Sequence, residues 1–593
     1  MHSRKQVIIP VLVGLNSLNF IQNYLCMKIC FVWVKEFRNF NNLGLNLAND
    51  IKFKYQAEDN VILHERVEAL PKNFFGKDIT DVTGIIGKNG TGKSNALELI
   101  CKCLKGSKTS LKTEFIIILK VDGGYTCYYN LYNNEIPKVG FKMKFEKYEG
   151  AINPLKVVFF SNVYDDRRNN FDKEIVDISV NNTSRSFGIA KTYDFGKQVK
   201  FINSKIFRTL NIEIPTNVQI TNKVWSNKLA SISDQWNRKT NFSGLRRFFK
   251  DRTRDLKESS KFVILLKYGF FLEIYPKLSR ETIIRFDSDG EFSKELGSIF
   301  SDDKLYGFST DEVSDILLDF IEKQVERYGY DENFVPTEHS SKELYNRLDL
   351  IRKQIYFIRE LKYQISELEL SYSAEGIRGR NTENFIFNYK SDFTNSFVNQ
   401  FISLFEDCSF LDINWLGISS GHKAYLNLFS SIHNELRLTR TPNLLLCIDE
   451  GDLYLHPRWQ IEFFDKLLSV LPTIYSGSIQ LILTSHSPFL LSDLPKQNIT
   501  ILNNEKSESS SFDGINLAIN TFGGNLYDLY SEPFFLGNRR TSDFAYDKIK
   551  YLIEKVELDK YTNEEKKELV KLTNILGDDI IKYRINSLLN SND

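Results

Sequence analysis

The sequence has almost no excess of charge, few cysteines and no long uninterrupted apolar segment. Its 77 Lys and Arg residues stand against 76 Asp and Glu residues, a net charge of +1 that excludes a uniformly basic nucleic-acid coat but allows a local basic patch. Seven scattered cysteines, an odd number, do not form the framework of a disulfide-stabilised secreted protein, so we expect a cytoplasmic protein. The 593 residues are enough for two or more hydrophobic cores.

The most apolar stretch near the N-terminus, residues 7–25, is interrupted by polar side chains such as Asn16 and Asn19. It is too polar for a membrane-spanning helix and lacks the small-residue cleavage site of a signal peptide, so we expect no membrane association. Met27, one of only three methionines, stands directly before a strand pattern. We interpret Met27 as the candidate biological start and residues 1–26 as an N-terminal extension.

A glycine-rich turn between an apolar run (82–86) and a helix-forming segment (95–103) matches the phosphate-binding pattern G-x-x-x-x-G-K-[ST]. Glycines let successive backbone N–H groups point at phosphate oxygens, and the following helix adds its dipole. Lys93 would reach the β- and γ-phosphates, and the Ser94 hydroxyl would ligate Mg²⁺. The predicted loop consists of Gly87, Lys88, Asn89, Gly90, Thr91, Gly92, Lys93 and Ser94. The sequence therefore predicts a site for ATP and Mg²⁺.

Alternating apolar residues predict several strands on both sides of this loop. We expect them at residues 28–37, 43–47, 51–55, 114–120, 125–131, 141–145 and 157–160. Gly123-Gly124 is the predicted hairpin turn between two of them. Ser161-Asn162, with Tyr164-Asp165-Asp166 just beyond, follows the last strand. Polar residues there either contact Mg²⁺ or the attacking water, or only cap a turn.

Residues 200–390 show a helical and irregular pattern. Residues 343–370 carry apolar side chains at three- and four-residue spacing, which predicts an amphipathic helix that pairs with residues 313–328. The pattern covers about four heptads at most, so we expect a short helical arm.

A basic segment lies inside this insertion, with nine Lys or Arg residues against three acids between residues 238 and 261. Arg246, Arg247 and Lys250 would contact a nucleic-acid backbone. A solvated helix face that packs its aromatic residues inward explains the same pattern.

A second group of motifs follows the insertion. Residues 443–450 form an apolar run that ends in Asp449 and Glu450, as expected of a strand buried on both faces. Asp449 would hold Mg²⁺ through water, and Glu450 would deprotonate the attacking water. A core strand that meets a turn is the structural alternative.

Two further segments have the geometry of anion contacts. Ser419, Ser420 and Gly421 precede a helix at 424–436 and offer a hydroxyl and free N–H groups. A buried strand at 479–484 leads to His486, which can hydrogen-bond a γ-phosphate or the attacking water.

In this order the motifs resemble those of the ABC-type ATPase family. Gly87–Ser94 resembles Walker A, Ser419–Gly421 the signature motif, Asp449-Glu450 Walker B and His486 the switch histidine. Residues 451–457 resemble the segment after Walker B in the RecF, SMC and OLD-like branch. The resemblance implies that two heads pair head-to-tail, each signature closing over the ATP of the other.

One departure from the family is His422, where Glu or Gln is usual; it bears on the strength of the contact between subunits and on the pH dependence of hydrolysis. Ser94 and Ser419 are 325 residues apart (419 − 94), far more than in transporter ATPases, which favours the branch with a helical insertion. The arm has no Cys-x-x-Cys for a zinc hook, and no acidic cluster of a TOPRIM nuclease follows His486.

Residues 28–40 and 520–529 are similar to stretches of bacterial defence ATPases, in Septu-type systems and in retrons with a similar pair of proteins. This resemblance implies an ATPase that controls a separate effector, a nuclease such as an HNH enzyme. Arg38 stands where some relatives contact nucleotide, although a surface arginine is the simpler explanation. The alternatives are a RecF/SMC-like DNA-repair ATPase that binds DNA, and a nucleotide-gated scaffold with little turnover.

The predicted fold is α/β: an ABC-ATPase head, with a P-loop sheet and an antiparallel β layer, and a helical insertion between Walker A and the signature. The C-terminal part should contain an exposed serine-rich loop at 507–511, a helix at 544–558 and a capping box formed by Thr562 and Glu565. The predicted divisions are an extension at 1–26, a first head lobe at 27–200, a helical arm at 201–395, a second lobe at 396–505 and a partner-docking or lid region at 506–593.

Overall fold

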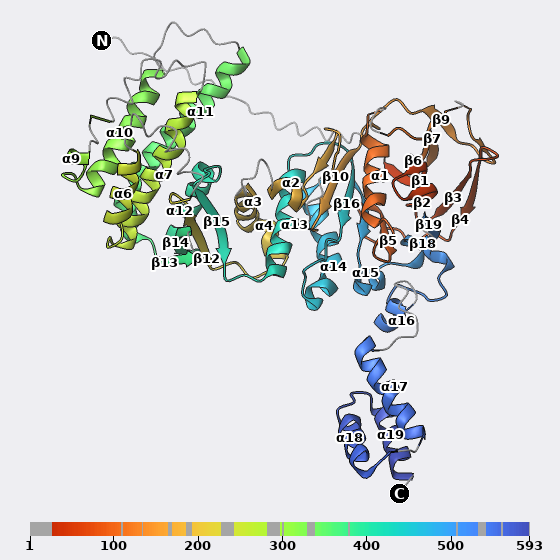
Figure 1. Cartoon of the computed structure of the whole chain (residues 1–593). Coiled ribbons are helices and arrows are strands. Elements are labelled where there is room, and N and C mark those ends of the chain that lie inside the picture. Colours follow the sequence, from red (N-terminus) through yellow and green to blue (C-terminus); the bar gives the residue numbers. More distant parts are fainter. Residues whose placement is uncertain are drawn as a thin grey trace, which may run out of the picture.

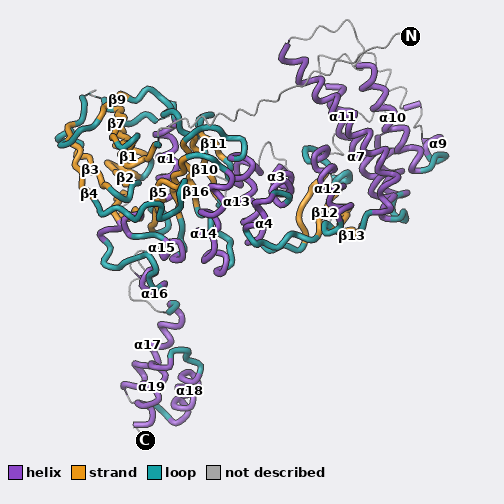
Figure 2. Tube along the Cα trace, turned by 180° about the vertical axis from the view of Figure 1, so that it is seen from behind, coloured by secondary structure: helices purple, strands orange, loops and turns teal. Residues whose placement is uncertain are grey.

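The computed structural model describes residues 26–591 with internal gaps. The gaps are residues 108–110, 133–134, 164–168, 185–192, 227–241, 281–296, 299–301, 329–337, 378–379, 506–507, 532–540 and 559–560. The inserted helices lie at one end of the molecule and the large sheet at the other, while the last three helices extend away from the sheet (Figures 1 and 2). The N-terminal extension and the segment Tyr164 to Asp166 lie outside the described residues.

Twelve strands of the described chain form one mixed sheet, and the predicted α/β class is confirmed. The strands from β11 to β18 run parallel, and most of the pairs beyond β18 are antiparallel. Their order is β11 (Ile175–Asp177), β10 (Lys156–Ser161), β16 (Asn443–Asp449), β17 (Ser478–Thr484), β5 (Ile79–Gly87), β18 (Ile499–Glu505), β19 (Glu508–Asp513), β2 (Phe40–Asn46), β1 (Met27–Phe37), β6 (Phe115–Val121), β7 (Gly124–Asn130) and β9 (Lys144–Lys147).

The parallel strands are apolar throughout because both of their faces are covered. In β16, Leu444 and Leu446 belong to the core beneath helices α13 (Ser420–Leu436) and α14 (Pro457–Ile474), whereas Leu445 belongs to the core beneath α1 (Lys93–Lys105). A strand in this position alternates its side chains between two cores, so every residue is buried. The short helix α15 (Pro488–Asp493) follows β17 and packs on α14.

A small sheet of β3 (Ile51–Gln56), β4 (Val61–Arg66) and β8 (Lys138–Val139) covers the antiparallel part. The turn between β6 and β7 lies one residue earlier than predicted. Gly124 pairs with Val121, so Asp122 and Gly123 are the central residues, with φ of 48° and 82°. A two-residue turn with both φ values positive matches the twist of a hairpin, and Asp tolerates that conformation.

The insertion contains helices, as predicted, and also a sheet that the prediction of a helical and irregular region did not include. Four strands of this region form an antiparallel sheet, in the order β13 (Leu370–Ile377), β14 (Arg380–Asn388), β12 (Asn217–Asn222) and β15 (Leu411–Leu416). Strand β12 pairs with β14 and β15, whose residues are about 160 to 200 positions away in the sequence, and these three strands each contribute two buried apolar side chains between polar ones. β15 lies beyond the predicted boundary at residue 395, yet it pairs with β12 of the insertion.

The predicted pairing of the two arm helices is confirmed. Helix α10 (Thr310–Tyr328) packs on α11 (Glu338–Gln364), and Arg359 forms ion pairs with Asp319 and Glu322. A third helix, α7 (Glu258–Arg280), packs on both and was not predicted. It is apolar on nearly every side, so it lacks a marked amphipathic stripe. The other helices of the region are α2 (Val180–Ser184), α3 (Tyr193–Ile202), α4 (Lys205–Thr209), α6 (Phe242–Arg252), α9 (Asp302–Leu305) and α12 (Asp392–Phe405).

The serine-rich segment before the C-terminal helices is a strand, which corrects the predicted exposed loop. From Glu508 it forms β19, and Ser509 is buried. The helices that follow are α16 (Leu526–Ser531), α17 (Asp543–Leu558), α18 (Asn563–Asn574) and α19 (Asp579–Ser591). The predicted capping box at α18 is present: Thr562 accepts from the Glu565 N–H, and the Glu565 carboxylate accepts from the Thr562 N–H. Within the described ranges, no helix is long and apolar enough to cross a membrane.

A buried ion pair stands at the start of the P-loop strand. The Asp81 carboxylate is inaccessible to solvent and lies 2.7 Å from Lys28 Nζ on β1. It also accepts hydrogen bonds from the Asn49 and Val82 N–H groups and from the Asn498 side chain. This single carboxylate therefore joins four segments of the head.

We predict that Asp81→Ala lowers the free energy of unfolding by about 3 kcal/mol, because removal of one partner leaves a buried ammonium and several donors without their acceptor. Lys35→Ala serves as the control, since Lys35 is more than half exposed where it pairs with Glu114, and its loss should cost much less because an exposed ion pair contributes little to stability. Urea unfolding of both variants measures the difference. Equal losses for the two variants would contradict the assignment.

Candidate nucleotide-binding site

The predicted phosphate loop lies between β5 and α1 in the curled form that its glycines permit. Gly90 and Gly92 have φ of 81° and 94°. A side chain at position 92 would also lie 2.7 Å from the Asn39 amide nitrogen. The Thr91 hydroxyl donates to the Lys88 carbonyl at 2.8 Å, which closes the turn from inside. The glycines and the Thr91 hydroxyl thus hold the loop in its curled form.

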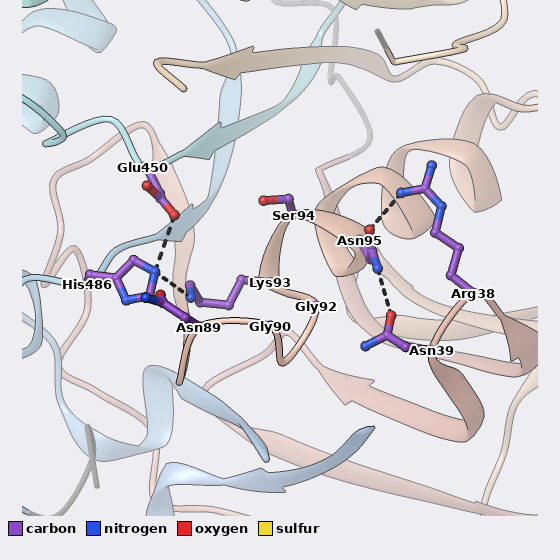
Figure 3. Close-up of a pocket in the computed structure, with 10 residues that line it drawn as sticks. All are labelled: Arg38, Asn39, Asn89, Gly90, Gly92, Lys93, Ser94, Asn95, Glu450 and His486. Carbon is purple, nitrogen blue, oxygen red and sulfur yellow. Dashed lines mark hydrogen bonds and ion pairs between the residues drawn. The ribbon is translucent and has the colours of Figure 1, made fainter. Parts of the chain in front are cut away.

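A cavity of about 440 Å³ opens beside the loop. Figure 3 shows Lys93, Glu450 and His486 pointing toward one another beside the loop, while Arg38, Asn39 and Asn95 contact one another on the other side of Ser94. The lining of the cavity consists of Arg38, Asn39, Asn89, Gly90, Gly92, Lys93, Ser94, Asn95, Glu450 and His486. The structure therefore brings Walker A, the second Walker B carboxylate and the predicted switch histidine to one place.

Asp449, at the carboxyl end of β16, is surrounded by hydroxyl groups. Its carboxylate lies 2.9 and 3.0 Å from Ser94 Oγ, and it accepts from Thr484 Oγ1 at 2.7 Å and from Ser161 Oγ at 3.2 Å. Burial raises the pKa of Asp449, and the hydrogen bonds from these hydroxyls act against that shift. The cluster joins the ends of β10, β16 and β17 to the start of α1.

The oxygen atoms of this cluster suit a magnesium ion. Octahedral Mg²⁺ binds oxygen at about 2.0–2.1 Å, which places neighbouring ligands about 3 Å apart. The separation of Ser94 Oγ and the Asp449 carboxylate matches this value. A hard cation also prefers carboxylate and hydroxyl oxygens over other donors. Ser94 and Asp449 would hold the ion, directly or through its water molecules.

Glu450 is held in an unusual backbone conformation. Its φ is 49°, in the left-handed region, and its N–H donates to both the carbonyl and the hydroxyl of Thr484. The strained turn directs the carboxylate into the cavity, 3.3 Å from His486 Nε2. The hydrogen bond with His486 lowers the pKa of Glu450, so the group is an ionised carboxylate at neutral pH.

His486 Nε2 contacts two groups that make opposite demands on it. It lies 2.7 Å from Lys93 Nζ and 3.3 Å from Glu450 Oε1. A bare Nε2 accepts a hydrogen bond from the lysine, whereas a protonated Nε2 donates to the glutamate. Burial lowers the pKa of the Lys93 ammonium, and the charges of Glu450 and Asp449 oppose this shift. A ligand that moves Lys93 would therefore change the hydrogen bonds of the triad formed by Lys93, His486 and Glu450.

The signature segment does not line this cavity. Ser419 caps α13 by accepting the His422 N–H at 3.1 Å, and both Ser419 and Ser420 are exposed. Gly421 is buried against the segment after Walker B, where an added Cβ would lie 2.9 Å from the Tyr454 carbonyl oxygen. His422 is buried beside Trp459, and burial lowers its pKa. His422 therefore faces the interior of its own chain.

Several residues at the site carry no motif and were not predicted. Thr484 is the last residue of a strand whose other residues have the pattern of a buried core strand. The change from apolar Leu483 to polar Thr484 is the one sequence signal that its hydroxyl bonds Asp449. Arg38, which the family resemblance had indicated, lines the cavity and donates to Asn95. Asn39 and Asn95 were not predicted, and they bond each other at 2.6 Å. They come from separate segments with no spacing rule, so only the folded chain identifies them.

The basic segment of the arm is only partly exposed. Arg247 and Lys250 are on the surface, whereas Arg246 is half-buried and donates to the Trp225 carbonyl at 2.9 Å. Lys261 is buried against Glu383 at 3.0 Å. Residues 238 and 239 lie outside the described ranges. Phe248 and Phe249 pack inward, as the structural alternative expects.

We predict that Thr484→Val lowers the free energy of unfolding by about 2 kcal/mol, because the isosteric change leaves Asp449 Oδ1 and the Glu450 N–H short of a partner. Thr80→Val is the matched control, since Thr80 is half-buried on the neighbouring strand and donates only to the Ile479 carbonyl; its loss should cost less than about 1 kcal/mol. Thermal and urea unfolding measure both. A control that loses as much as Thr484→Val would count against the cluster.

Comparison with known proteins agrees with the geometry of the site. The profile of the AAA ATPase domain family matches residues 27–491. The chain is 34% identical over 100 residues to a retron Vc95 probable ATPase of Vibrio cholerae serotype O1 biovar El Tor, which covers 16% of this chain and 18% of that protein. It is 28% identical over 152 residues to a retron Ec83 probable ATPase of Escherichia coli, 24% of this chain and 27% of that protein. The aligned stretches thus span less than a third of either relative. The match over residues 27–491 places the chain in the AAA ATPase domain family.

Proposed function

We propose that this chain is the ATP-hydrolysing subunit of a bacterial anti-phage defence system and that it controls a separate effector, a nuclease such as an HNH enzyme. The convergence of Lys93, Asp449, Glu450 and His486 on one cavity carries the enzymatic part of the proposal. The two retron ATPases among the relatives support the defence role.

The proposed reaction is hydrolysis of the β–γ phosphoanhydride bond of ATP. The loop N–H groups and Lys93 bind the phosphates, and a magnesium ion held by Ser94 and Asp449 would supply charge neutralisation. A water oxygen forms the new bond to the γ-phosphorus, the bond to the bridging oxygen breaks, and ADP leaves. The proton of the water passes to the ionised Glu450.

His486 couples phosphate binding to the base in this scheme. Its Nε2 lies between Lys93 and Glu450. Phosphate groups attract the Lys93 ammonium, which releases His486 to orient the γ-phosphate or the attacking water. Glu450 then loses one of the charges that stabilise its ionised form, so its proton affinity rises when it is needed.

A head-to-tail dimer would complete the site. The cavity is open, and Ser419 and Ser420 of the same chain do not line it. These two residues are exposed at the N-terminus of a 17-residue helix, where free N–H groups can bind an anion. A second copy would bring its Ser420 and Gly421 to the γ-phosphate, so ATP would join the two subunits.

We predict that Glu450→Gln reduces ATP hydrolysis by about 10²–10⁴-fold, because the amide cannot accept the proton. Nucleotide affinity should stay within about threefold, since the change keeps the shape of the side chain and leaves the phosphate loop intact. Phosphate release and equilibrium binding of ATP separate the two effects. Glu462→Gln, a surface change on α14, is the control and should behave as the wild type. Wild-type turnover by Glu450→Gln would disprove the assignment of the base.

We predict complementation between two inactive variants. Lys93→Ala lacks the phosphate lysine and Ser420→Arg blocks the signature, so each alone should be inactive. In a mixed head-to-tail dimer, one site combines the intact loop of one chain with the intact signature of the other. Random pairing of equal amounts should restore roughly a quarter of the wild-type rate. A mixture that stays inactive, with both variants folded, would contradict a shared site.

The second hypothesis, a DNA-binding repair ATPase, rests on the exposed Arg247 and Lys250. Nucleic-acid contact through a phosphate backbone weakens with salt, and charge reversal at these two positions would remove it. A duplex-binding measurement on the isolated chain decides between the two functions. Co-purification with an effector protein, with and without ATP, tests the leading proposal directly.

A further inference from the structure

Strand β19 reaches the phosphate loop from more than four hundred residues downstream. The Ser509 hydroxyl donates to the Thr91 carbonyl at 2.8 Å, and the Ser509 N–H donates to the Asn39 carbonyl at 3.1 Å. Only 4% of Ser509 is exposed, so water does not compete for these bonds. Ser509 is also the single residue through which β19 pairs with β2, opposite Phe40. The backbone pairing of β19 with β2 therefore lies at the residue that holds the loop.

Asn39 completes the contact from the turn between β1 and β2. Its amide nitrogen donates to Ser509 Oγ at 2.7 Å and to the Thr91 carbonyl at 3.3 Å. Its amide oxygen accepts from Asn95 on α1 at 2.6 Å. The Thr91 carbonyl thus receives two hydrogen bonds from behind the loop, one from each side chain. Gly92 has no Cβ, which leaves room for the Asn39 amide.

The geometry of one peptide group turns this contact into a means of positioning the loop. In a planar trans peptide, the C=O of Thr91 and the N–H of Gly92 point in opposite directions. Hydrogen bonds that fix the Thr91 carbonyl toward Ser509 and Asn39 therefore fix the Gly92 N–H away from them. Gly92 lines the cavity. Donors to a carbonyl also polarise the amide, which strengthens its N–H as a donor.

We propose that Ser509 and Asn39 are positioning residues for the phosphate site: they hold the Thr91–Gly92 peptide so that its N–H faces the phosphates. This inference rests on the proposed nucleotide binding, and it does not require hydrolysis or a dimer. The loop N–H groups cradle the α- and β-phosphates, which ATP and ADP share. Loss of the hydrogen bonds from Ser509 and Asn39 to the Thr91 carbonyl should therefore weaken the binding of ATP and of ADP by the same factor.

The test compares two serines of the same strand in the full chain. Ser509→Ala removes the donor to Thr91, whereas Ser511→Ala removes a donor to the Gly44 carbonyl of β2, which has no part in the loop. We expect Ser509→Ala to weaken Mg·ATP and Mg·ADP about three- to tenfold, the effect of one hydrogen bond. Ser511→Ala should bind both nucleotides as the wild type does. Titration calorimetry measures the four dissociation constants.

Two further measurements separate positioning from general stability. Ser509→Thr keeps the hydroxyl in a residue that favours strands and should restore most of the affinity. The melting temperature without nucleotide should fall further for Ser509→Ala, whose hydroxyl makes two hydrogen bonds, than for Ser511→Ala, whose hydroxyl makes one, so the titrations are carried out well below both melting temperatures.

Wild-type affinity in Ser509→Ala, or the same loss of affinity in Ser511→Ala, would overturn the proposal. A loss confined to ATP would also overturn it, because the effect would then lie at the γ-phosphate. A wild-type chain that binds both nucleotides without turnover would refute the proposed hydrolysis and leave this inference standing.

Discussion

The site depends on the hydrogen bonds that the buried Asp449 carboxylate accepts. Three hydroxyl groups converge on it, from Ser94, Ser161 and Thr484, and each belongs to a different element. Parallel strands make this convergence possible, because their carboxyl ends meet at one edge of the sheet. The hydroxyls offset the cost of burying a charge, and the same oxygen atoms are the ligands that magnesium prefers. The same arrangement of oxygen atoms therefore stabilises the buried carboxylate and suits the binding of a magnesium ion.

Thr484 extends this order from the metal site to the base. Its hydroxyl donates to Asp449 and accepts from the Glu450 N–H, so one side chain sets the positions of two neighbouring carboxylates. Two residues further on, His486 lies against Glu450 and Lys93. The order of polar residues at the end of β17 thus aligns Asp449, Glu450 and Lys93. Hydrogen bonds of this kind cost no reorganisation when a ligand arrives.

Sequence reasoning succeeded where the physical signal is local. The buried strand before Asp449 and the loop before Lys93 are contiguous patterns, and the structure contains both elements with nearly the predicted bounds. It failed for the sheet of the insertion, because its strands pair across more than a hundred residues and each carries few apolar side chains. The contact between Ser509 and the phosphate loop was not predicted, for a related reason. A serine-rich segment reads as a loop, and only tertiary hydrogen bonds reveal a buried strand.

The phosphate loop with its triad and the segment at Ser419 and Ser420 differ in how far their polar groups are buried and hydrogen-bonded. The loop and the triad formed by Lys93, Glu450 and His486 are held by hydrogen bonds within this chain. The exposed Ser419 and Ser420 do not line the cavity. The Ser419 hydroxyl caps the helix by accepting the His422 N–H, and the exposed first turn of the helix gains further stabilisation from an anion. The polar groups of Ser419 and Ser420 are exposed, whereas polar side chains of the loop are buried and hydrogen-bonded. This difference is the physical reason to expect that ATP binding and subunit pairing are one event.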